Sequence, residues 1–365
     1  MKLKSCIRRI FLLLLNSNLT TMKIKSTLLV ALIILTSVSF GQETLLMYRD
    51  NGLWGVMNLK GEVLVEKKFG VAKPFKNGMA KVGKFQFVDT KGEVFHLRNY
   101  IKRNLLDCRE FSEGLLGVKV SSAWGFLNKE GKLVVPAIYK YITDFNSGYA
   151  AVRKKEGFFI IDKNGVEQKV INNHKKKVSY IKKFSEGLAP IERNGLWGFV
   201  NGEGNIVIEP IYLAVGYFKG GVAWARMEKG GKVGFLKKDG SWKVEPILNA
   251  AKDFDLVSGL AKIHDGKGWC YLNIDGKVKR FENSRDNKRF SDGMCPETAT
   301  MGNAKSGYLD SDGNWATKRE FGIATHFNNG YAAVRKNNKW GVIDKKGNWI
   351  LEPKYSYIKG FYTVD

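Results

Sequence analysis

The sequence of 365 residues predicts an all-β protein, a tandem array of about nine three-stranded antiparallel meanders. Two observations lead to this fold class. A turn glycine recurs at a mean spacing of about 36 residues, and each interval holds three short apolar runs typical of β-strands. The nine glycines are Gly61, Gly92, Gly131, Gly165, Gly204, Gly240, Gly276, Gly313 and Gly347. Such a period indicates units that bury their apolar faces against one another.

The first strand of each unit follows the pattern Gly-x-Ala-x-Val. Examples begin at Gly78, Gly148 and Gly330, and each continues with alanine and valine at every second position. A period of two places alternate side chains on opposite faces of a strand. The pattern therefore predicts a short strand directly after each of these glycines.

The second strand contains the pair Trp-Gly. This pair occurs at Trp54-Gly55, Trp124-Gly125, Trp197-Gly198 and Trp340-Gly341. Glycine weakens a strand interior unless a neighbouring group needs the space. We therefore expect an aromatic ring to lie over the bare backbone of each glycine.

The third strand follows a turn of the form Asp/Asn-x-x-Gly, as in Asp344 to Gly347. In several units the strand then reaches a proline, which has no N–H for a ladder and is expected to end it. These prolines are Pro136, Pro210, Pro246 and Pro353. A connector such as Tyr139 to Phe145 then leads to the next unit.

The two ends of the array indicate whether it is open or closed. Nine complete meanders fit between Gln42 and Asp365, and no strand is left over to join the ends. A β-propeller usually has four strands in each blade, whereas three are counted here. We therefore expect an open, twisted, solenoid-like stack, with a closed β-propeller-like array as the alternative.

Residues 1–41 have the features of a leader with a signal peptide. A basic segment begins at Met22, the expected true start, an apolar run covers Thr27–Leu35, and small residues precede a cleavage site before Gln42. The apolar run is shorter than the roughly 18 residues that a spanning helix needs. The sequence thus predicts an exported protein, periplasmic, surface-located or secreted, with no transmembrane anchor and with residues 42–365 as the array.

The combined motifs resemble the bacterial WG-repeat (KWG-repeat) family. Trp-Gly, Asp-Lys-x-Gly, Pro-x-Tyr and Phe-x-x-Gly-x-Ala-x-Val carry the resemblance, which covers residues 43–365. The resemblance implies interaction and not a particular reaction. The expected function is non-enzymatic binding or scaffolding, with a protein or an anionic envelope polymer as partner. The alternative is a cell-envelope polysaccharide hydrolase, because Asp and Glu are spread along the chain.

The charge of the chain points to an anionic partner. The net charge is +25, and it remains +19 without residues 1–41, which hold six basic and no acidic side chains. Many basic residues flank the predicted hairpins, and stacking would align them in rows that attract anionic polymers. The candidate patch is Arg153, Lys154, Lys155, Arg335, Lys336 and Lys339. The alternative is a solvated edge that discourages strand-to-strand aggregation. Nucleic acid is not expected as the partner of an exported chain.

No catalytic, metal or cofactor motif is predicted. His96, His174, His264 and His326 belong to different units and lack the spacing of metal ligands. Outside the leader the cysteines are Cys108, Cys270 and Cys295. We expect small buried thiols in strands, with a Cys270–Cys295 disulfide as the alternative. The oligomeric state is left open.

Overall fold

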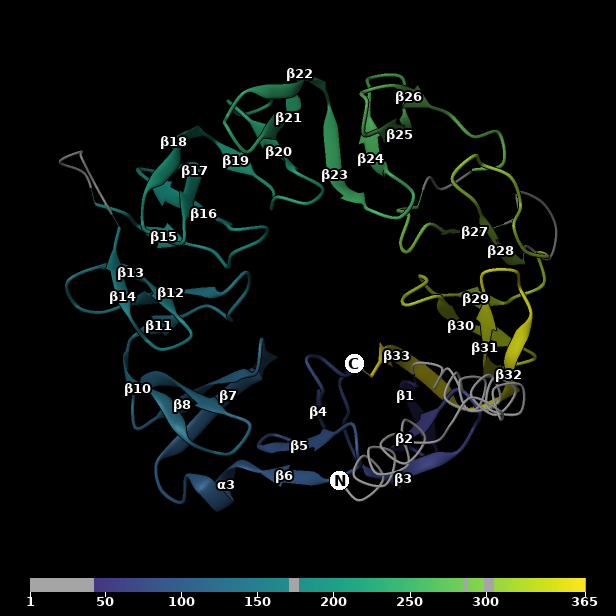
Figure 1. Ribbon diagram of the computed structural model, residues 1–365. Coiled ribbons are helices and arrows are strands. Elements are labelled where there is room, and N and C mark those ends of the chain that lie inside the picture. Colours follow the sequence, from purple (N-terminus) through teal and green to yellow (C-terminus); the bar gives the residue numbers. More distant parts are fainter. Residues whose placement is uncertain (1–42, 171–176, 285–287, 299–304, 365) are drawn as a thin grey trace, which may run out of the picture. The chain divides into compact units, whose positions relative to one another are not determined.

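The computed structural model describes residues 43–170, 177–284, 288–298 and 305–364 (Figure 1). The predicted leader and the cleavage site before Gln42 lie outside the described residues. Thr44–Asp365 form one compact unit. No helix among the described residues is long and apolar enough to cross a membrane.

The all-β repeat prediction is confirmed: the described residues form nine small antiparallel sheets, numbered here in chain order. Sheet 1 contains β1 (Thr44–Asp50), β2 (Leu53–Asn58), β3 (Val63–Phe69) and β33 (Tyr357–Thr363); sheet 2 contains β4 (Met79–Lys81), β5 (Gln86–Asp89) and β6 (Val94–His96). Sheet 3 contains β7 (Leu105–Ser112), β8 (Leu115–Val120), β9 (Ala123–Asn128) and β10 (Leu133–Tyr139). The short helix α3 (Leu97–Tyr100) precedes sheet 3.

The remaining sheets repeat this arrangement. Sheet 4 contains β11 (Tyr141–Ile142), β12 (Tyr149–Arg153), β13 (Phe158–Asp162) and β14 (Glu167–Lys169); sheet 5 contains β15 (Tyr180–Ile181), β16 (Leu188–Arg193), β17 (Leu196–Asn201) and β18 (Ile206–Tyr212). Sheet 6 contains β19 (Ala214–Val215), β20 (Val222–Arg226), β21 (Val233–Lys237) and β22 (Trp242–Leu248); sheet 7 contains β23 (Ala250–Asp255), β24 (Leu260–His264), β25 (Trp269–Asn273) and β26 (Val278–Lys279). Sheet 8 contains β27 (Cys295–Thr298) and β28 (Ser306–Leu309); sheet 9 contains β29 (Ile323–Ala324), β30 (Tyr331–Lys336), β31 (Lys339–Asp344) and β32 (Trp349–Tyr355).

Most sheets have four strands, so the count of three per unit is corrected. The extra strand comes from the connector, which pairs with the first predicted strand of the following unit. In sheet 4, Tyr141 lies opposite Arg153 and Ile142 opposite Val152. Four of these connector strands are only two residues long, which is too short to show the alternation that indicates a strand in a sequence.

The predicted turn glycines are confirmed, since all nine have φ between +81° and +88°. Glycine adopts such left-handed backbone without the steric cost of a Cβ. The preceding Asp or Asn stabilises the turn: Asp344 Oδ1 accepts hydrogen bonds from the N–H groups of Lys346 and Asn348, both at 2.9 Å. In eight of the nine turns an Asp or Asn holds the glycine turn in this way, whereas Lys237 occupies that position in the turn of sheet 6.

The ends of the array are joined. The last connector strand, β33, pairs with β1 along its length, as Leu45 opposite Tyr362 and Tyr48 opposite Ile358. Within Thr44–Asp365, Figure 1 shows the sheets following one another in chain order, with β33 beside β1. The expectation that no strand joins the ends is thus corrected, and the closed alternative is the one that this pairing supports.

The apolar core has the same cyclic order. Nine clusters of buried residues each lie between two consecutive sheets, and one of them lies between sheets 9 and 1. In that cluster Leu46 and Tyr48 of β1 pack with Trp340 and Val342 of β31. An open stack of nine sheets would have eight such interfaces. The ninth interface buries the apolar face that would otherwise end the array.

The glycine of the Trp-Gly pair is required for a different reason from the one expected. A Cβ on Gly125 would lie 2.6 Å from the carbonyl oxygen of Val135 and 2.7 Å from the backbone nitrogen of Ala137. The register shifts here, because Val135 pairs with Phe126 but Tyr139 pairs with Trp124. A bulge around Pro136 therefore fills the space above the glycine. Rings contribute only in some copies, such as Tyr48 at Gly55.

The prolines do not end the third strand, so the expectation that each proline would terminate it is corrected. The strand β10 continues through Pro136 to Tyr139, and β32 continues through Pro353 to Tyr355. Proline is tolerated at a bulge because the ladder hydrogen bond is already interrupted there. The Trp-Gly and Pro-x-Tyr motifs are thus the two sides of one bulge.

Replacing Gly125 with alanine is expected to lower the free energy of unfolding by about 1–3 kcal/mol, because the backbone of β10 must move away from the new methyl group. Chemical denaturation measures this loss. Gly70→Ala is the matched control, since no atom lies within 4 Å of its Cβ position and its backbone is not left-handed. The control is expected to stay within about 0.5 kcal/mol of the wild type. Equal stability of both variants would refute the bulge explanation.

The three cysteines are buried free thiols, as expected. Cys270 packs between sheets 6 and 7, whereas Cys295 packs between sheets 7 and 8. Burial raises the pKa of the Cys295 thiol to about 12. The alternative of a Cys270–Cys295 disulfide is not found.

Candidate functional site

The six residues of the predicted anionic-ligand patch lie in two separate hairpins. Arg153, Lys154 and Lys155 lie at the β12–β13 hairpin of sheet 4, and the other three lie at the β30–β31 hairpin of sheet 9. No hydrophobic cluster of described residues joins sheets 4 and 9, because other sheets lie between them in both directions. The structure therefore groups these residues in threes and does not bring all six together.

Two of the six have structural partners. Lys154 Nζ lies 2.5 Å from Glu167 Oε1, and it also lies 5.5 Å from the ring centres of Tyr139 and Phe159. Lys336 Nζ lies 2.9 Å from Glu320 Oε2. These two side chains contribute to their own sheets. Arg153, Lys155 and Lys339 are the exposed members of the patch, whereas Arg335 is half-buried.

Arg153 belongs to a larger group of aromatic and basic side chains that the sequence analysis did not identify. We call this group the Tyr180 strip; it comprises Tyr141, Arg153, Phe158, Tyr180, Lys182, Lys183, Trp197 and Tyr217. It extends over sheets 4, 5 and 6. Tyr141 and Tyr180 open the connector strands β11 and β15, whereas Tyr217 follows β19. The sequence signal is therefore a tyrosine at the start of two neighbouring connectors.

The rings of the strip contact one another across the sheets. The hydroxyl of Tyr141 donates a hydrogen bond to the hydroxyl of Tyr180 at 3.0 Å, and their ring centres are 5.4 Å apart. Tyr180 is also 6.3 Å from the ring centres of both Phe158 and Trp197. Burial and the hydrogen bond with Tyr180 raise the pKa of the Tyr141 hydroxyl, which stays protonated near neutral pH.

The basic side chains of the strip lie against these rings. Lys182 Nζ is 4.0 Å from the ring centre of Trp197, and Lys183 Nζ is 5.4 Å from that of Tyr217. Burial lowers the pKa of Lys182, and the charge of Glu192 partly opposes this shift. Tyr180 remains 38% exposed. The strip thus presents an accessible ring beside cations held in place by cation–π contacts, a combination suited to anionic ligands with apolar faces.

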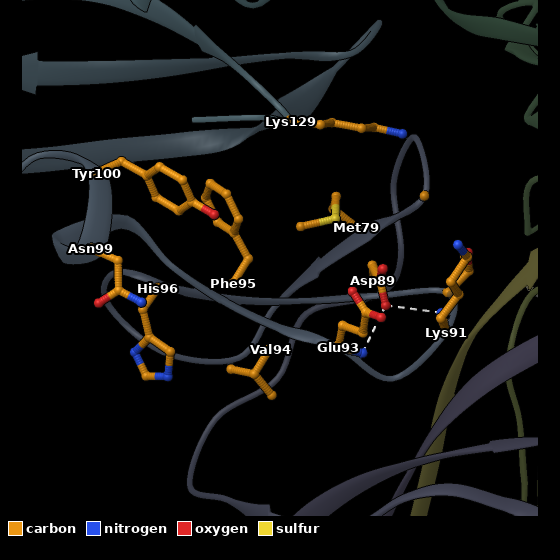
Figure 2. Close-up of a pocket in the computed structure, with 12 residues that line it drawn as sticks. Met79, Asp89, Lys91, Glu93, Val94, Phe95, His96, Asn99, Tyr100 and Lys129 are labelled. Carbon is orange, nitrogen blue, oxygen red and sulfur yellow. Dashed lines mark hydrogen bonds between the residues drawn. The ribbon is translucent and has the colours of Figure 1, made fainter. Parts of the chain in front are cut away.

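A pocket of about 410 Å³ lies beside sheets 2 and 3 (Figure 2). Figure 2 shows Phe95 and Tyr100 on one side, Asp89, Lys91 and Glu93 on another, and Lys129 extending from the neighbouring sheet. The lining residues are Gly78, Met79, Asp89, Thr90, Lys91, Glu93, Val94, Phe95, His96, Asn99, Tyr100 and Lys129. The helix α3 is part of an insertion in this unit and supplies Asn99 and Tyr100.

The walls of the pocket are held by local contacts. The rings of Phe95 and Tyr100 stack with their centres 4.7 Å apart and an interplanar angle of 18°. Asp89 Oδ1 accepts hydrogen bonds from the N–H groups of Lys91 and Glu93 at 2.9 and 2.8 Å. The pocket therefore combines an aromatic wall with cationic, anionic and amide groups.

The histidines do not form a common site within the described residues. His96 lies at the pocket, His264 contacts the ring of Trp269, and His326 is exposed. His174 lies outside the described residues. No group of three His, Cys, Asp or Glu side chains in the described ranges is placed to hold a metal ion.

These features define a class: an all-β repeat protein whose consecutive sheets share one backbone plan and differ in the side chains at their hairpins and turns. The family described as "WG containing repeat" matches residues 54–84, 124–158, 175–197, 197–232, 307–340 and 340–363. The chain belongs to this WG-repeat family. No curated protein sequence matches it.

Several solved structures resemble this chain at low sequence identity. "Crystal structure of the eukaryotic initiation factor" has a TM-score of 0.56 at 11% identity and covers 88% of this chain and 98% of its own. "Dihydro-heme d1 dehydrogenase NirN in complex with DHE" reaches 0.43 at 12% identity, covering 88% and 75%. Hsv2p of Kluyveromyces lactis reaches 0.40 at 12% identity, covering 71% and 99%. The first likeness supports the fold and carries nothing about activity.

Proposed function

We propose that this chain is an exported binding or scaffold protein without catalytic activity, and that its partner is an anionic polymer of the cell envelope. The observation that carries the proposal is the Tyr180 strip, where cations and an accessible tyrosine lie side by side over three consecutive sheets. Repeating sheets suit this role because each one adds a further contact along an extended partner.

The charge of the chain supports the same proposal. Outside residues 1–41 the net charge is +19, so an anionic polymer is attracted before any specific contact forms. Membership of the WG-repeat family is consistent with interaction. No observation favours the hydrolase alternative. A protein partner is the second possibility, and the binding experiment separates it from a polymer.

Binding to an acidic polysaccharide, with polygalacturonate as the probe, is expected to weaken as salt rises, because exposed charges are screened beyond about 8 Å at physiological ionic strength. Replacing Arg153 and Lys183 together with glutamine is expected to reduce affinity about tenfold. The measurement is equilibrium binding at low and high salt, with neutral dextran as the reference polymer.

The control variant replaces Lys219 and Lys267 with glutamine, because both are exposed and neither belongs to the strip. It removes the same charge and is expected to keep most of the affinity. Lys154 and Lys336 are avoided, since their reversal would break ion pairs with Glu167 and Glu320. Affinity that ignores salt, or that falls equally in both double variants, would show that the strip is not the binding surface.

A further inference from the structure

A lysine–carboxylate contact recurs between consecutive sheets. In three sheets the residue after the Asp or Lys that opens the glycine turn is a lysine, which reaches an acidic side chain of the preceding sheet. The pairs are Lys163 with Glu113 at 3.2 Å, Lys238 with Glu186 at 3.6 Å, and Lys345 with Asp292 at 2.9 Å. We call this contact the latch.

The carboxylate of each latch also accepts backbone hydrogen bonds from its neighbour. Glu113 accepts from the N–H of Gly148 at 3.0 Å, and Asp292 accepts from the N–H of Gly330. Glu186 accepts from the N–H groups of Gly220 and Gly221 at 2.7 and 2.9 Å. The latch therefore neutralises the lysine and joins two sheets at the same point.

A fourth lysine occupies the latch position without its carboxylate. Lys129 lies in the β9–β10 turn of sheet 3, but the corresponding residue of sheet 2 is Asn77. The amide of Asn77 instead donates to the carbonyl oxygen of Phe111 at 3.4 Å. Among the described residues Lys129 forms no ion pair. Its Nζ lies beside Gly78, 3.2 Å from the position of a Cβ there.

The unpaired ammonium group lies at the pocket beside sheets 2 and 3 (Figure 2). Lys91 provides a second exposed cation there, while Glu93 and Asn99 offer an exposed carboxylate and amide. An ammonium group without a protein counterion is available to a ligand's anionic group. The carboxylate and amide in the same pocket suit the several hydroxyl groups of a sugar.

We propose that this pocket binds an acidic sugar unit, with the sugar carboxylate at Lys129 and Lys91, hydroxyl groups at Glu93 and Asn99, and the apolar part of the ring against Phe95 and Tyr100. The inference deepens the proposed function, on which it rests for the polymer class. The volume of about 410 Å³ accommodates one or two sugar units. The missing latch carboxylate is what makes the site specific to this pair of sheets.

Calorimetry with digalacturonic acid tests the pocket separately from polymer binding. The Lys129→Gln variant removes the ammonium group, and a weakening of about tenfold or more is expected from the loss of a charge-assisted contact. Asn77→Asp restores the carboxylate that the latches have, and it is expected to capture Lys129 and weaken binding similarly. Its melting temperature is measured as well, because the bond to Phe111 is lost. Asp292 has φ of +54° and Asn77 has +52°, so aspartate suits the backbone.

Lys163→Gln is the matched control, because it removes a lysine from the same turn position of sheet 4, where the latch is complete. Its affinity for digalacturonic acid is expected to equal that of the wild type. The proposal is supported if Lys129→Gln and Asn77→Asp lose binding while Lys163→Gln keeps it.

Four results would overturn it. Binding of neutral digalactose as strongly as the acidic disaccharide contradicts the role of the ammonium group, and binding unchanged in both pocket variants places the ligand elsewhere. If polygalacturonate binds through the Tyr180 strip while the disaccharide does not bind at all, the pocket inference fails and the proposed function stands. If neither binds, both fail.

Discussion

Ending the chain at Ser356 is expected to lower the free energy of unfolding by on the order of 5 kcal/mol, because it removes two buried side chains of the closing strand. Ile358 is fully buried and Phe361 is 6% exposed, and both pack in the cluster between sheets 9 and 1. The same change removes the pairing partner of β1, although β1 lies more than 300 residues away in sequence. Closure therefore couples the two ends of the array.

Hydrogen exchange distinguishes closure from ordinary end effects. Without β33, the amides of β1 that pair with it, between Leu45 and Arg49, are expected to lose protection. A chain ending at Thr363 keeps every pair of β33 and serves as the control. Unchanged exchange in β1 after removal of β33 would contradict closure. In an open array the loss of amide protection would be confined to sheet 9.

Trp340→Ala is expected to destabilise the protein by about 3–5 kcal/mol, which is the cost of truncating a well-buried tryptophan. The side chain is 6% exposed, and its ring centre lies 4.7 Å from that of Tyr357 in the closing strand. The substitution leaves a cavity between sheets 9 and 1. Denaturation by urea, followed by circular dichroism, measures the loss.

Trp269 is the matched control, because it occupies the equivalent position of β25 in sheet 7 but is 38% exposed. Its replacement by alanine is expected to cost roughly 1 kcal/mol. Similar losses in both variants would mean that the motif tryptophan acts through its own strand and not through packing between sheets.

The Tyr180 strip and the pocket show how sheets with one backbone plan differ in their surface side chains. The turn glycines and the apolar faces recur along the array, and the bulge recurs in five sheets, so side chains at hairpins and turns are free to differ. Lys163, Lys238 and Lys345 are used to join sheets, whereas Lys129 has the same backbone position and no carboxylate opposite. One substitution in a neighbouring unit thus converts a structural lysine into a candidate ligand group.

The sequence by itself determined the strand order within each unit, the nine turns and the repeat family. These follow from local chemistry: glycine for left-handed backbone, Asp or Asn for capping, and alternation for strands. The basic residues of the predicted patch could also be named from the sequence, but their partners could not. Lys154 and Glu167 are brought together only when β13 and β14 pair.

Only the tertiary structure decided the number of strands per sheet, the closure, and the places where side chains from different units meet. The connector strand has two residues in several sheets, so its pairing depends on the neighbouring strand and not on its own sequence. Closure requires the accumulated twist of nine sheets to return β33 to β1, a long-range property that no single repeat contains. The Tyr180 strip and the pocket also join residues of successive units. Their geometry is set by how one sheet packs on the next.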